Sequence, residues 1–301
     1  MKIAAMHCLA VALVLWNCSG KWVDGRIEDP IQPEVTGGAK APDVPYLPTP
    51  MNAVAQMLDM AEVTREDVIY DLGCGDGRIV ITAAKERQAR GVGIDISPDR
   101  IRESRINAQH AGVADRVRFL EQDLFTSDFS DASVVAIYLT PALNIRLRPK
   151  ILNELKPGTR IVSHKFGMGE WKPDQSASVE GRDIYFWIVP ANVSGTWEWT
   201  AAGLEGKGSH RLELTQTFQK VEGILVAQSE SNPITETRLV GDRLQFTVPR
   251  KVDGRYMPVR YEGRVQGDSM AVRRIAVAVE NGPASWQARR NPATMTPWTA
   301  R

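Results

Sequence analysis

The chain has 301 residues, with 37 Lys and Arg against 36 Asp and Glu, so its formal net charge is +1. Hydrophobic residues make up 43% and charged residues 24%, which excludes a mainly disordered, collagen-like or coiled-coil chain. The length suits two domains of about 150 residues each. A chain this close to neutral lacks the broad basic field that holds a long nucleic acid by charge alone.

Residues 1–20 are predicted to be a secretory signal peptide or an uncleaved membrane anchor, which places the protein in the periplasm or membrane. Met1-Lys2 precedes an apolar run from Ile3 to Trp16, and Cys18-Ser19-Gly20 has the small residues of a cleavage site. The alternative is a misassigned start and a cytoplasmic protein. Removing this segment leaves Cys74 as the only cysteine of three, so no intrachain disulfide and no metal site are expected.

Residues 21–43 are predicted to be a linker, because prolines and glycines interrupt every regular pattern there. Strand and helix signals then alternate from residue 44 to residue 190. Strand-like apolar runs lie at 68–72, 91–95, 117–120, 133–139 and 159–163, and helical spacing at 49–61, 78–87, 97–112 and 143–155. This alternation predicts a doubly wound, Rossmann-like α/β domain with a parallel sheet, followed by an antiparallel strand at 184–189.

Helical periodicity disappears after Pro190. Short alternating runs lie at 196–199, 211–218, 224–228, 235–239, 244–248, 261–265 and 270–279. This spacing predicts an antiparallel barrel or sandwich for residues 191–301, interpreted as a binding or packing module. Gly195-Thr196-Trp197 and Arg289 loosely resemble the glycine-x-tryptophan and arginine cluster of lipocalin-like barrels. The alternative is that Trp197 is a core residue of another small β fold.

The clearest site signal is the run DLGCGDG from Asp71 to Gly77, which follows an apolar strand and opens a helix. Glycines there let the backbone turn sharply and let a ligand approach the main chain. The next strand ends in Asp95, 18 residues after Gly77, where an acid suits the two hydroxyls of a ribose. Asp123 follows the third strand at the same edge. These residues predict a nucleoside pocket at the carboxyl ends of the strands.

A dinucleotide and S-adenosylmethionine both fit such a pocket. The dinucleotide pattern is G-x-G-x-x-G with the pyrophosphate at the helix N-terminus, whereas Gly73, Gly75 and Gly77 alternate with single residues. Asp71 before the loop and Asp76 within it would repel a pyrophosphate. The two carboxylates suit a ligand with an amino group and a sulfonium, so a nicotinamide-dependent oxidoreductase is disfavoured.

On these residues the chain resembles the class I, seven-strand S-adenosylmethionine-dependent methyltransferases over about residues 44–190. The resemblance implies that Asp71 to Gly77 is their first motif, that Asp95 binds the ribose and that Asp123 lies beside the adenine. The cofactor-binding residues that it implies are Tyr46, Asp71, Gly73, Gly75, Asp76, Gly77, Asp95, Ile96, Asp123 and Leu124.

Four further segments narrow the resemblance to one subgroup. They are Pro45–Pro50, Tyr138–Pro141, Leu147–Lys150 and Val162–Gly167 with Trp171. The subgroup includes bacterial proteins of unassigned substrate and the mitochondrial protein-lysine methyltransferases that act on membrane proteins. The resemblance therefore implies a protein substrate, in some cases membrane-associated, with lysine as the methyl acceptor and no nucleic-acid partner.

The acceptor is expected at the end of the fourth strand, where many nucleic-acid and glutamine N-methyltransferases carry Asn/Asp-Pro-Pro-Tyr/Phe. This chain has Tyr138-Leu-Thr-Pro141 there, which disfavours adenine and glutamine methylation. A lysine must lose its proton before it attacks a methyl group, and a desolvating aromatic pocket helps. Tyr138 is therefore the catalytic candidate and Tyr46 a candidate lid, with strand packing and a linker contact as alternatives. His164 and Lys165 at the same edge are either catalytic or structural.

Two other functions remain open at this point. One is an exported protein that binds a nucleoside or an apolar ligand without catalysis, and the other is a small-molecule methyltransferase. The predicted leader conflicts with methyl transfer, because S-adenosylmethionine is made in the cytoplasm. An anchor that leaves the catalytic domain inside, or a wrong start, would remove the conflict.

Overall fold

The computed structural model describes residues 22–23, 26–27, 46–201, 208–227, 230–252, 255–275 and 285–299. The leader predicted at residues 1–20 lies outside these residues, as does most of the predicted linker. Within that linker, β1 (Trp22–Val23) pairs with β2 (Arg26–Ile27), a regular element where none was expected. Among the described residues, no helix has the length and apolar character needed to cross a membrane.

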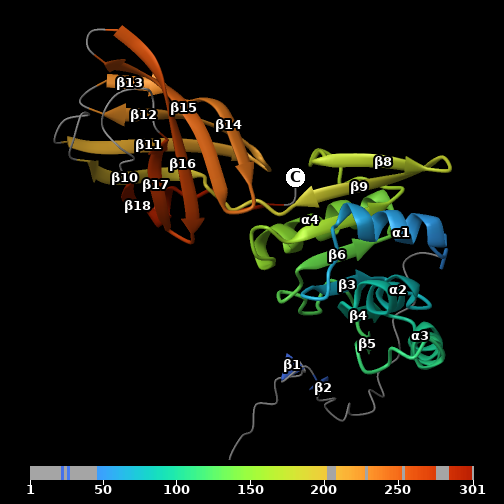
Figure 1. Cartoon of the computed structure of the whole chain (residues 1–301). Helices are drawn as coiled ribbons and strands as arrows, with labels where there is room; N and C mark the ends of the chain where they lie inside the picture. Colours follow the sequence, from blue (N-terminus) through green and yellow to red (C-terminus); the bar gives the residue numbers. More distant parts are fainter. Residues whose placement is uncertain are drawn as a thin grey trace, which may run out of the picture. The chain divides into compact units, whose positions relative to one another are not determined.

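The first large sheet has seven strands in the order β5-β4-β3-β6-β7-β9-β8 (Figure 1). Its strands are β3 (Val68–Leu72), β4 (Arg90–Asp95), β5 (Val117–Glu121), β6 (Val134–Ile137), β7 (Arg160–His164), β8 (Gln175–Val179) and β9 (Arg182–Ile188). The strands β3 to β7 pair in parallel, and β9 pairs antiparallel with β7, as the sequence predicted. The expected doubly wound sheet is thus confirmed, with β8 as an additional edge strand.

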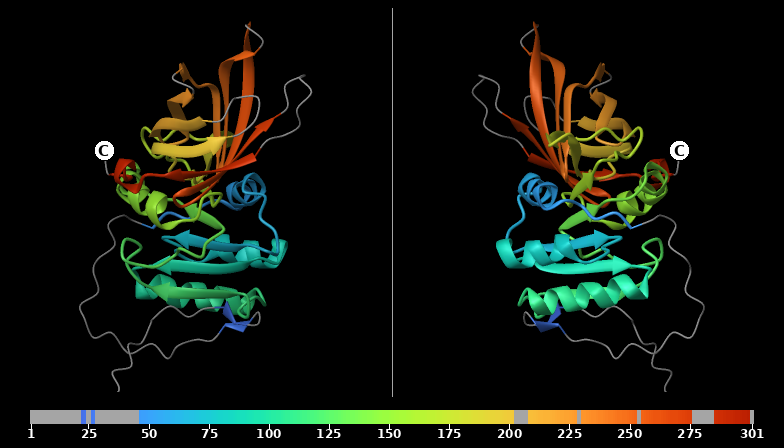
Figure 2. Two further views of the ribbon diagram at one scale, coloured as in Figure 1. Left: turned by 90° about the vertical axis from the view of Figure 1, so that its left-hand side faces the viewer. Right: turned by 90° about the vertical axis from the view of Figure 1, so that its right-hand side faces the viewer.

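Four helices cover the two faces of this sheet: α1 (Met51–Met60), α2 (Arg78–Arg87), α3 (Pro98–His110) and α4 (Pro141–Glu154). Apolar side chains of α1, α2 and α3 share one buried cluster, which includes Ile69 of β3. Side chains of α4 share another with Tyr70 and Leu72. Alternate residues of β3 therefore face opposite layers, and Figure 2 shows α1 and α4 on opposite sides of the sheet.

The second sheet has nine antiparallel strands in the order β13-β12-β11-β10-β18-β17-β16-β15-β14. Its strands are β10 (Gly195–Ala201), β11 (Gly208–Thr217), β12 (Lys220–Ala227), β13 (Glu230–Pro233), β14 (Thr235–Val240), β15 (Arg243–Val252), β16 (Arg255–Gln266), β17 (Ser269–Ile275) and β18 (Ser285–Arg290). β14 and β12 lie at or next to opposite edges of this sheet, yet Thr237 Oγ1 of β14 donates a hydrogen bond of 2.8 Å to Val221 O of β12. The single sheet thus nearly closes on itself, which makes it a barrel rather than a sandwich.

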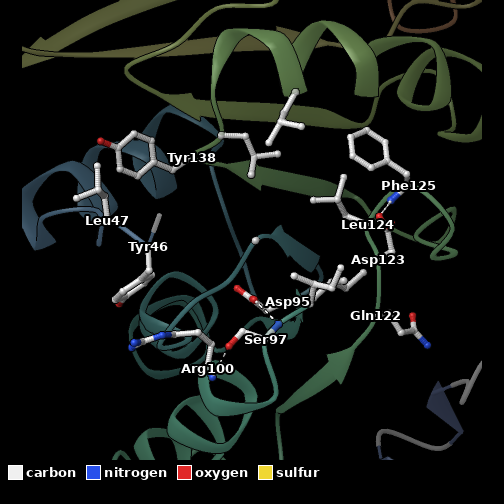
Figure 3. Close-up of a pocket in the computed structure, with 15 residues that line it drawn as sticks. Tyr46, Leu47, Asp95, Ser97, Arg100, Gln122, Asp123, Leu124, Phe125 and Tyr138 are labelled. Carbon is white, nitrogen blue, oxygen red and sulfur yellow. Dashed lines mark hydrogen bonds between the residues drawn. The ribbon is translucent and has the colours of Figure 1, made fainter. Parts of the chain in front are cut away.

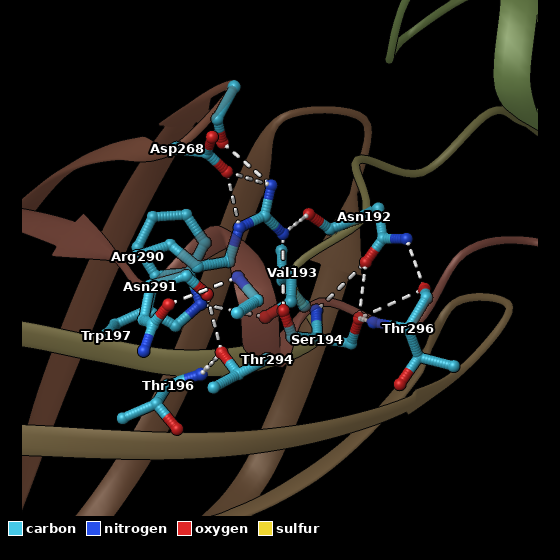
Figure 4. Close-up of polar contacts among 12 residues, drawn as sticks. Asn192, Val193, Ser194, Thr196, Trp197, Asp268, Arg290, Asn291, Thr294 and Thr296 are labelled. Carbon is cyan, nitrogen blue, oxygen red and sulfur yellow. Dashed lines mark hydrogen bonds and ion pairs between the residues drawn. The ribbon is translucent and has the colours of Figure 1, made fainter.

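Arg290, and not Arg289, is the arginine that packs on Trp197 (Figure 4). The Arg290 guanidinium lies 4.9 Å from the centre of the Trp197 ring, and its Nε donates to Asp268 at 2.8 Å. Its Nη1 donates to Asn192 O at 2.7 Å. The side chain of Arg289 points out of the barrel, because β18 alternates and Arg290 takes the inward position. The arginine expected from the sequence was wrong by one residue.

Candidate active site

The glycine loop between β3 and α2 has a left-handed backbone at three positions, with φ of 86° at Gly73, 54° at Gly75 and 80° at Gly77. The backbone N–H of Gly73 donates to Ile94 O at 2.8 Å. The N–H of Gly75 donates to Asp95 Oδ2 at 2.9 Å. The end of β4 therefore fixes the loop, and the acid predicted to bind ribose also holds the loop in shape.

Two of these glycines also lie where no side chain fits. A Cβ atom on Gly77 would come within 2.7 Å of the Phe119 ring, and a Cβ atom on Gly75 within 2.1 Å of Tyr46 Cε2. A side chain on Gly77 would collide with the buried Phe119 ring, and one on Gly75 would displace the Tyr46 ring, so both positions favour glycine for space as well as for φ. The loop thereby brings its backbone close to the end of the sheet.

Beside the loop lies a cavity of about 460 Å³, within the range of small-molecule sites (Figure 3). Seven predicted site residues line it: Tyr46, Gly73, Asp95, Ile96, Asp123, Leu124 and Tyr138. Figure 3 shows Tyr46, Leu47 and Tyr138 along one side and Asp123, Leu124 and Phe125 along the other. The end of β4, the segment after β5 and the end of β6 therefore contribute to one cavity, as expected for this edge of a doubly wound sheet.

The other four predicted residues, Asp71, Gly75, Asp76 and Gly77, are not among those that line the cavity. Asp71 is buried, with 2% of its surface exposed. Burial, followed by the negative charges of Asp95 and Asp76, raises the pKa of Asp71 to about 8. A cationic group near this cluster of three carboxylates would stabilise the ionised form of Asp71.

Asp76 is held by Arg78, an interaction that was not predicted from the sequence. Arg78 Nε donates to Asp76 Oδ1 at 2.9 Å and Nη2 to Asp76 Oδ2 at 2.6 Å. Burial raises the pKa of Asp76, but hydrogen bonds and charge from Arg78 outweigh it and hold that pKa below its ordinary value. The same guanidinium donates from Nη1 to Thr49 O at 2.9 Å. Arg78 thus joins the glycine loop to the N-terminal segment.

Tyr46, the candidate lid, lies over the glycine loop and under an arginine. Its ring contacts Gly75, and the Arg100 guanidinium lies 4.3 Å from its ring centre. Burial, followed by the charge of Asp76, raises the pKa of the Tyr46 hydroxyl. The ring thus covers part of the cavity while 38% of the residue stays exposed.

Tyr138, the candidate acceptor residue, packs against a buried histidine at the end of the neighbouring strand. Its ring centre lies 4.1 Å from that of His164, with 48° between the ring planes, and 6.3 Å from that of Phe166. His164 Nδ1 lies 3.3 Å from Thr49 Oγ1, and its buried Nε2 has no hydrogen-bond partner within the described part of the chain. Burial, followed by the charges of Arg182 and Lys165, lowers the pKa of His164, so the ring is neutral at pH 7.

Several cavity residues were not predicted from the sequence: Leu47, Ile94, Ser97, Arg100, Gln122, Phe125, Leu139 and Leu143. Arg100 lies in the first turn of α3, where an arginine resembles any solvated helix residue. Its contact with Tyr46 joins segments far apart in the chain, and no local pattern signals it. The ion pair of Asp76 and Arg78 is likewise not indicated by their spacing, because residues two apart do not face each other on a helix.

Cys74, within the glycine loop, is buried with 5% of its surface exposed. Burial, followed by the charges of Asp71 and Asp95, raises the pKa of its thiol well above the ordinary value. A protonated, buried thiol is a packing group rather than a nucleophile. Among the described residues, no group of three or more His, Cys, Asp or Glu side chains is arranged to hold a metal ion.

Comparison with known proteins agrees with this geometry. The sequence model of the ANTKMT methyltransferase domain family matches residues 71–175 of this chain. A protein-lysine N-methyltransferase of Saccharolobus islandicus is 43% identical over 153 residues, 49% of this chain and 95% of the relative. A mouse ATP synthase C-subunit lysine N-methyltransferase is 33% identical over 194 residues, 59% of this chain and 75% of the relative.

A solved structure of an RNA methyltransferase from Salinibacter ruber, in complex with S-adenosyl-L-homocysteine, is 51% identical. It covers 49% of this chain and 96% of its own, with a TM-score of 0.48. About half of this chain has no counterpart in the Saccharolobus islandicus relative.

The parallel sheet, the glycine loop and the acid at the end of β4 define a class I methyltransferase. The two lysine N-methyltransferases described above are 43% and 33% identical to this chain, over 95% and 75% of their own lengths. The chain therefore belongs to the same methyltransferase family as these two relatives. It is an S-adenosylmethionine-dependent enzyme.

The residues present fit this cofactor. Asp95 lies in the cavity wall, where a carboxylate suits the two hydroxyls of a ribose, and Asp123 and Leu124 lie across the cavity from Tyr46 and Tyr138 (Figure 3). Asp95 is the carboxylate of this cluster that lines the cavity, and Asp71 adds a second negative charge when a nearby cationic ligand stabilises its ionised form, whereas Asp76 is paired with Arg78.

Proposed function

We propose that this protein transfers a methyl group from S-adenosylmethionine to the ε-amino group of a lysine in a protein substrate. One observation carries the proposal: a single cavity is lined by Gly73 and Asp95 on the cofactor side and by Tyr138 on the acceptor side. The family relatives named as lysine methyltransferases, one of them for the C-subunit of ATP synthase, support lysine as the acceptor.

The cofactor binds, in this proposal, across the carboxyl ends of β3, β4 and β5. Asp95 would accept hydrogen bonds from the ribose hydroxyls, Ile96 and Leu124 would contact the adenine, and Asp123 would hold its edge. Asp71 in its ionised form balances the positive charge of the cofactor. The bound cofactor supplies an activated methyl group, whose bond to sulfur breaks as the lysine nitrogen forms the new bond.

The acceptor side of the cavity removes water from the lysine. Tyr138, Leu139 and Leu143 line this side of the cavity, and the apolar wall that they form disfavours a charged ammonium ion by desolvation, which favours the uncharged amine. The ammonium proton is lost to solvent before the amine attacks. Tyr138 contributes to the rate by orienting the nitrogen towards the methyl group.

The direct test is methyl transfer from radiolabelled S-adenosylmethionine by the full chain. Poly-L-lysine, poly-L-arginine and total RNA serve as parallel acceptors, and acid hydrolysis with mass spectrometry identifies the product. We expect methyllysine from poly-L-lysine alone, and none with the Asp95→Ala variant. Label in RNA or in a small molecule would replace lysine with another acceptor. Cofactor binding without transfer to any acceptor would favour a binding protein without catalysis.

A further inference from the structure

We propose that His164 is a positioning residue for the methyl acceptor. In this proposal His164 holds the Tyr138 ring in the cavity wall, and the Thr49 hydroxyl in turn orients the His164 ring. The inference rests on the proposed lysine transfer, because it concerns the acceptor side of the same cavity.

The contact between the two rings is the first part of the argument. Tyr138 follows β6 and His164 ends β7, its neighbour in the sheet, so the sheet fixes both backbones. The ring centres are 4.1 Å apart, closer than the range of about 4.5–7 Å that is usual for packed aromatic rings. Only 2% of His164 is exposed, whereas Tyr138 lines the cavity. The buried imidazole therefore limits the orientations of the ring that the substrate meets.

The hydrogen bond between Thr49 and His164 is the second part. Both partners are buried, Thr49 with 3% of its surface exposed, and Oγ1 lies 3.3 Å from His164 Nδ1. The other ring nitrogen, Nε2, has no hydrogen-bond partner among the described residues. The Thr49 hydroxyl is thus the polar contact that favours one orientation of the imidazole ring.

The third part of the argument is the position of Thr49 in the chain. Thr49 ends the segment that carries Tyr46 and Leu47, both of which line the cavity. Arg78 binds the backbone oxygen of Thr49, so this segment is also tied to the glycine loop. The side chain of Thr49 therefore connects the segment above the cofactor side to the wall of the acceptor side.

The decisive variant is Thr49→Val in the full chain, which keeps the shape of the side chain and removes its hydroxyl. We expect kcat/KM for poly-L-lysine to fall by about fivefold, as loss of one hydrogen bond implies. The dissociation constant of S-adenosylmethionine, measured by calorimetry, should change less than twofold. A role in folding alone would not separate these two quantities.

Thr159→Val is the matched control. Thr159 precedes β7 at its opposite end, is 4% exposed and donates from Oγ1 to Ala132 O at 3.2 Å. This variant also loses a buried threonine hydrogen bond, but it does so far along the strand from Tyr138. We expect a similar loss of thermal stability and an unchanged kcat/KM for poly-L-lysine.

His164→Phe completes the test, because phenylalanine keeps a ring against Tyr138 and loses Nδ1. We expect it to lower kcat/KM by the same factor as Thr49→Val. The double variant should be no worse than either single one, because both remove one interaction. His164→Ala, which removes the ring as well, should be at least threefold lower still.

The proposal is overturned if Thr49→Val leaves kcat/KM within twofold of the original protein, or if Thr159→Val lowers it equally. It is also overturned if cofactor affinity falls by the same factor as kcat/KM. Failure of the proposed lysine transfer looks different, because the unaltered protein would then give no methyllysine at all.

Discussion

The ring of Tyr46 lies directly on Gly75, so close that a Cβ atom there would come within 2.1 Å of Tyr46 Cε2. Gly75 also has a φ of 54°, in the left-handed region. Gly75→Ala should therefore weaken S-adenosylmethionine binding at least tenfold by displacing Tyr46 or distorting the loop, and should lower the melting temperature. Calorimetry and thermal unfolding measure the two effects.

Gly267→Ala is the control for this prediction, because Gly267 has a φ of 58° and a Cβ atom added there would have no neighbour within 4 Å. It should cost about 1 kcal/mol of stability from backbone strain alone and leave cofactor affinity unchanged. Equal losses of affinity in the two variants would show that the Tyr46 contact has no role.

Asp95 has two tasks in this structure, since Oδ2 accepts from Gly75 N and Oδ1 from Ser97 N, both at 2.9 Å. Asp95→Ala should lower cofactor affinity at least tenfold, because hydrogen bonds to a charged group contribute about 1.5–3 kcal/mol each. Asp99→Ala removes an exposed carboxylate of the same region and should change the affinity less than twofold. Calorimetric titration compares them, and similar affinities would refute the assignment of Asp95.

Asp71 should make stability depend on pH. Its pKa is raised from an ordinary 3.8 to about 8 in the folded protein, mainly by burial, so between these values only the folded state retains the proton. Stability should then fall as the pH rises from about 4 to about 8. Asp71→Asn removes this effect. The melting temperature of the variant minus that of the original protein should therefore increase as the pH rises from 5 to 8.

The same variant should bind S-adenosylmethionine more weakly, because it lacks the carboxylate that balances the cationic ligand. Asp115→Asn, a change at an exposed carboxylate, should alter neither property. A melting-temperature difference between Asp71→Asn and the original protein that stays constant with pH would contradict this account.

Arg290 should stabilise the barrel strongly. It is 7% exposed, donates to Asp268 and to Asn192 O, and packs on Trp197. Arg290→Ala removes these contacts from the buried guanidinium site and should cost about 3 kcal/mol. The exposed neighbour Arg289, replaced by Ala, should cost less than about 0.5 kcal/mol. Urea unfolding followed by tryptophan fluorescence checks both, and equal costs would contradict the assignment.

The periodicity of apolar residues predicted the elements whose side chains are buried. The helix expected at 78–87 is α2, and all five parallel strands lie where their apolar runs are. β8 was missed because its residues, Gln175–Val179, are mostly exposed and show no apolar pattern. β18 was missed because Arg290 occupies an inward position, and its partners Asp268 and Trp197 are known only once the barrel forms.

The residues of the candidate site likewise include some that the sequence predicted and some that it did not. Asp95, Asp123 and Tyr138 were found because each lies at or just after the end of a strand, and topology brings those ends together. The roles of Arg100 and Thr49 depend on contacts with Tyr46 and His164 that no spacing in the chain encodes. Sequence reasoning thus located the cavity, but not the side chains that connect its two sides.

Cys74 offers a way to follow the glycine loop in solution. Its thiol is buried and its pKa is raised, mainly by burial, so an alkylating reagent reacts with it only while the loop is open. Mass spectrometry of the peptide that contains Cys74 measures the rate of this alkylation, without any engineered residue. The thiol of Cys74 is therefore an internal reporter of the loop. The decrease in its alkylation rate with increasing ligand concentration measures how much a ligand stabilises the loop conformation in which Cys74 is buried.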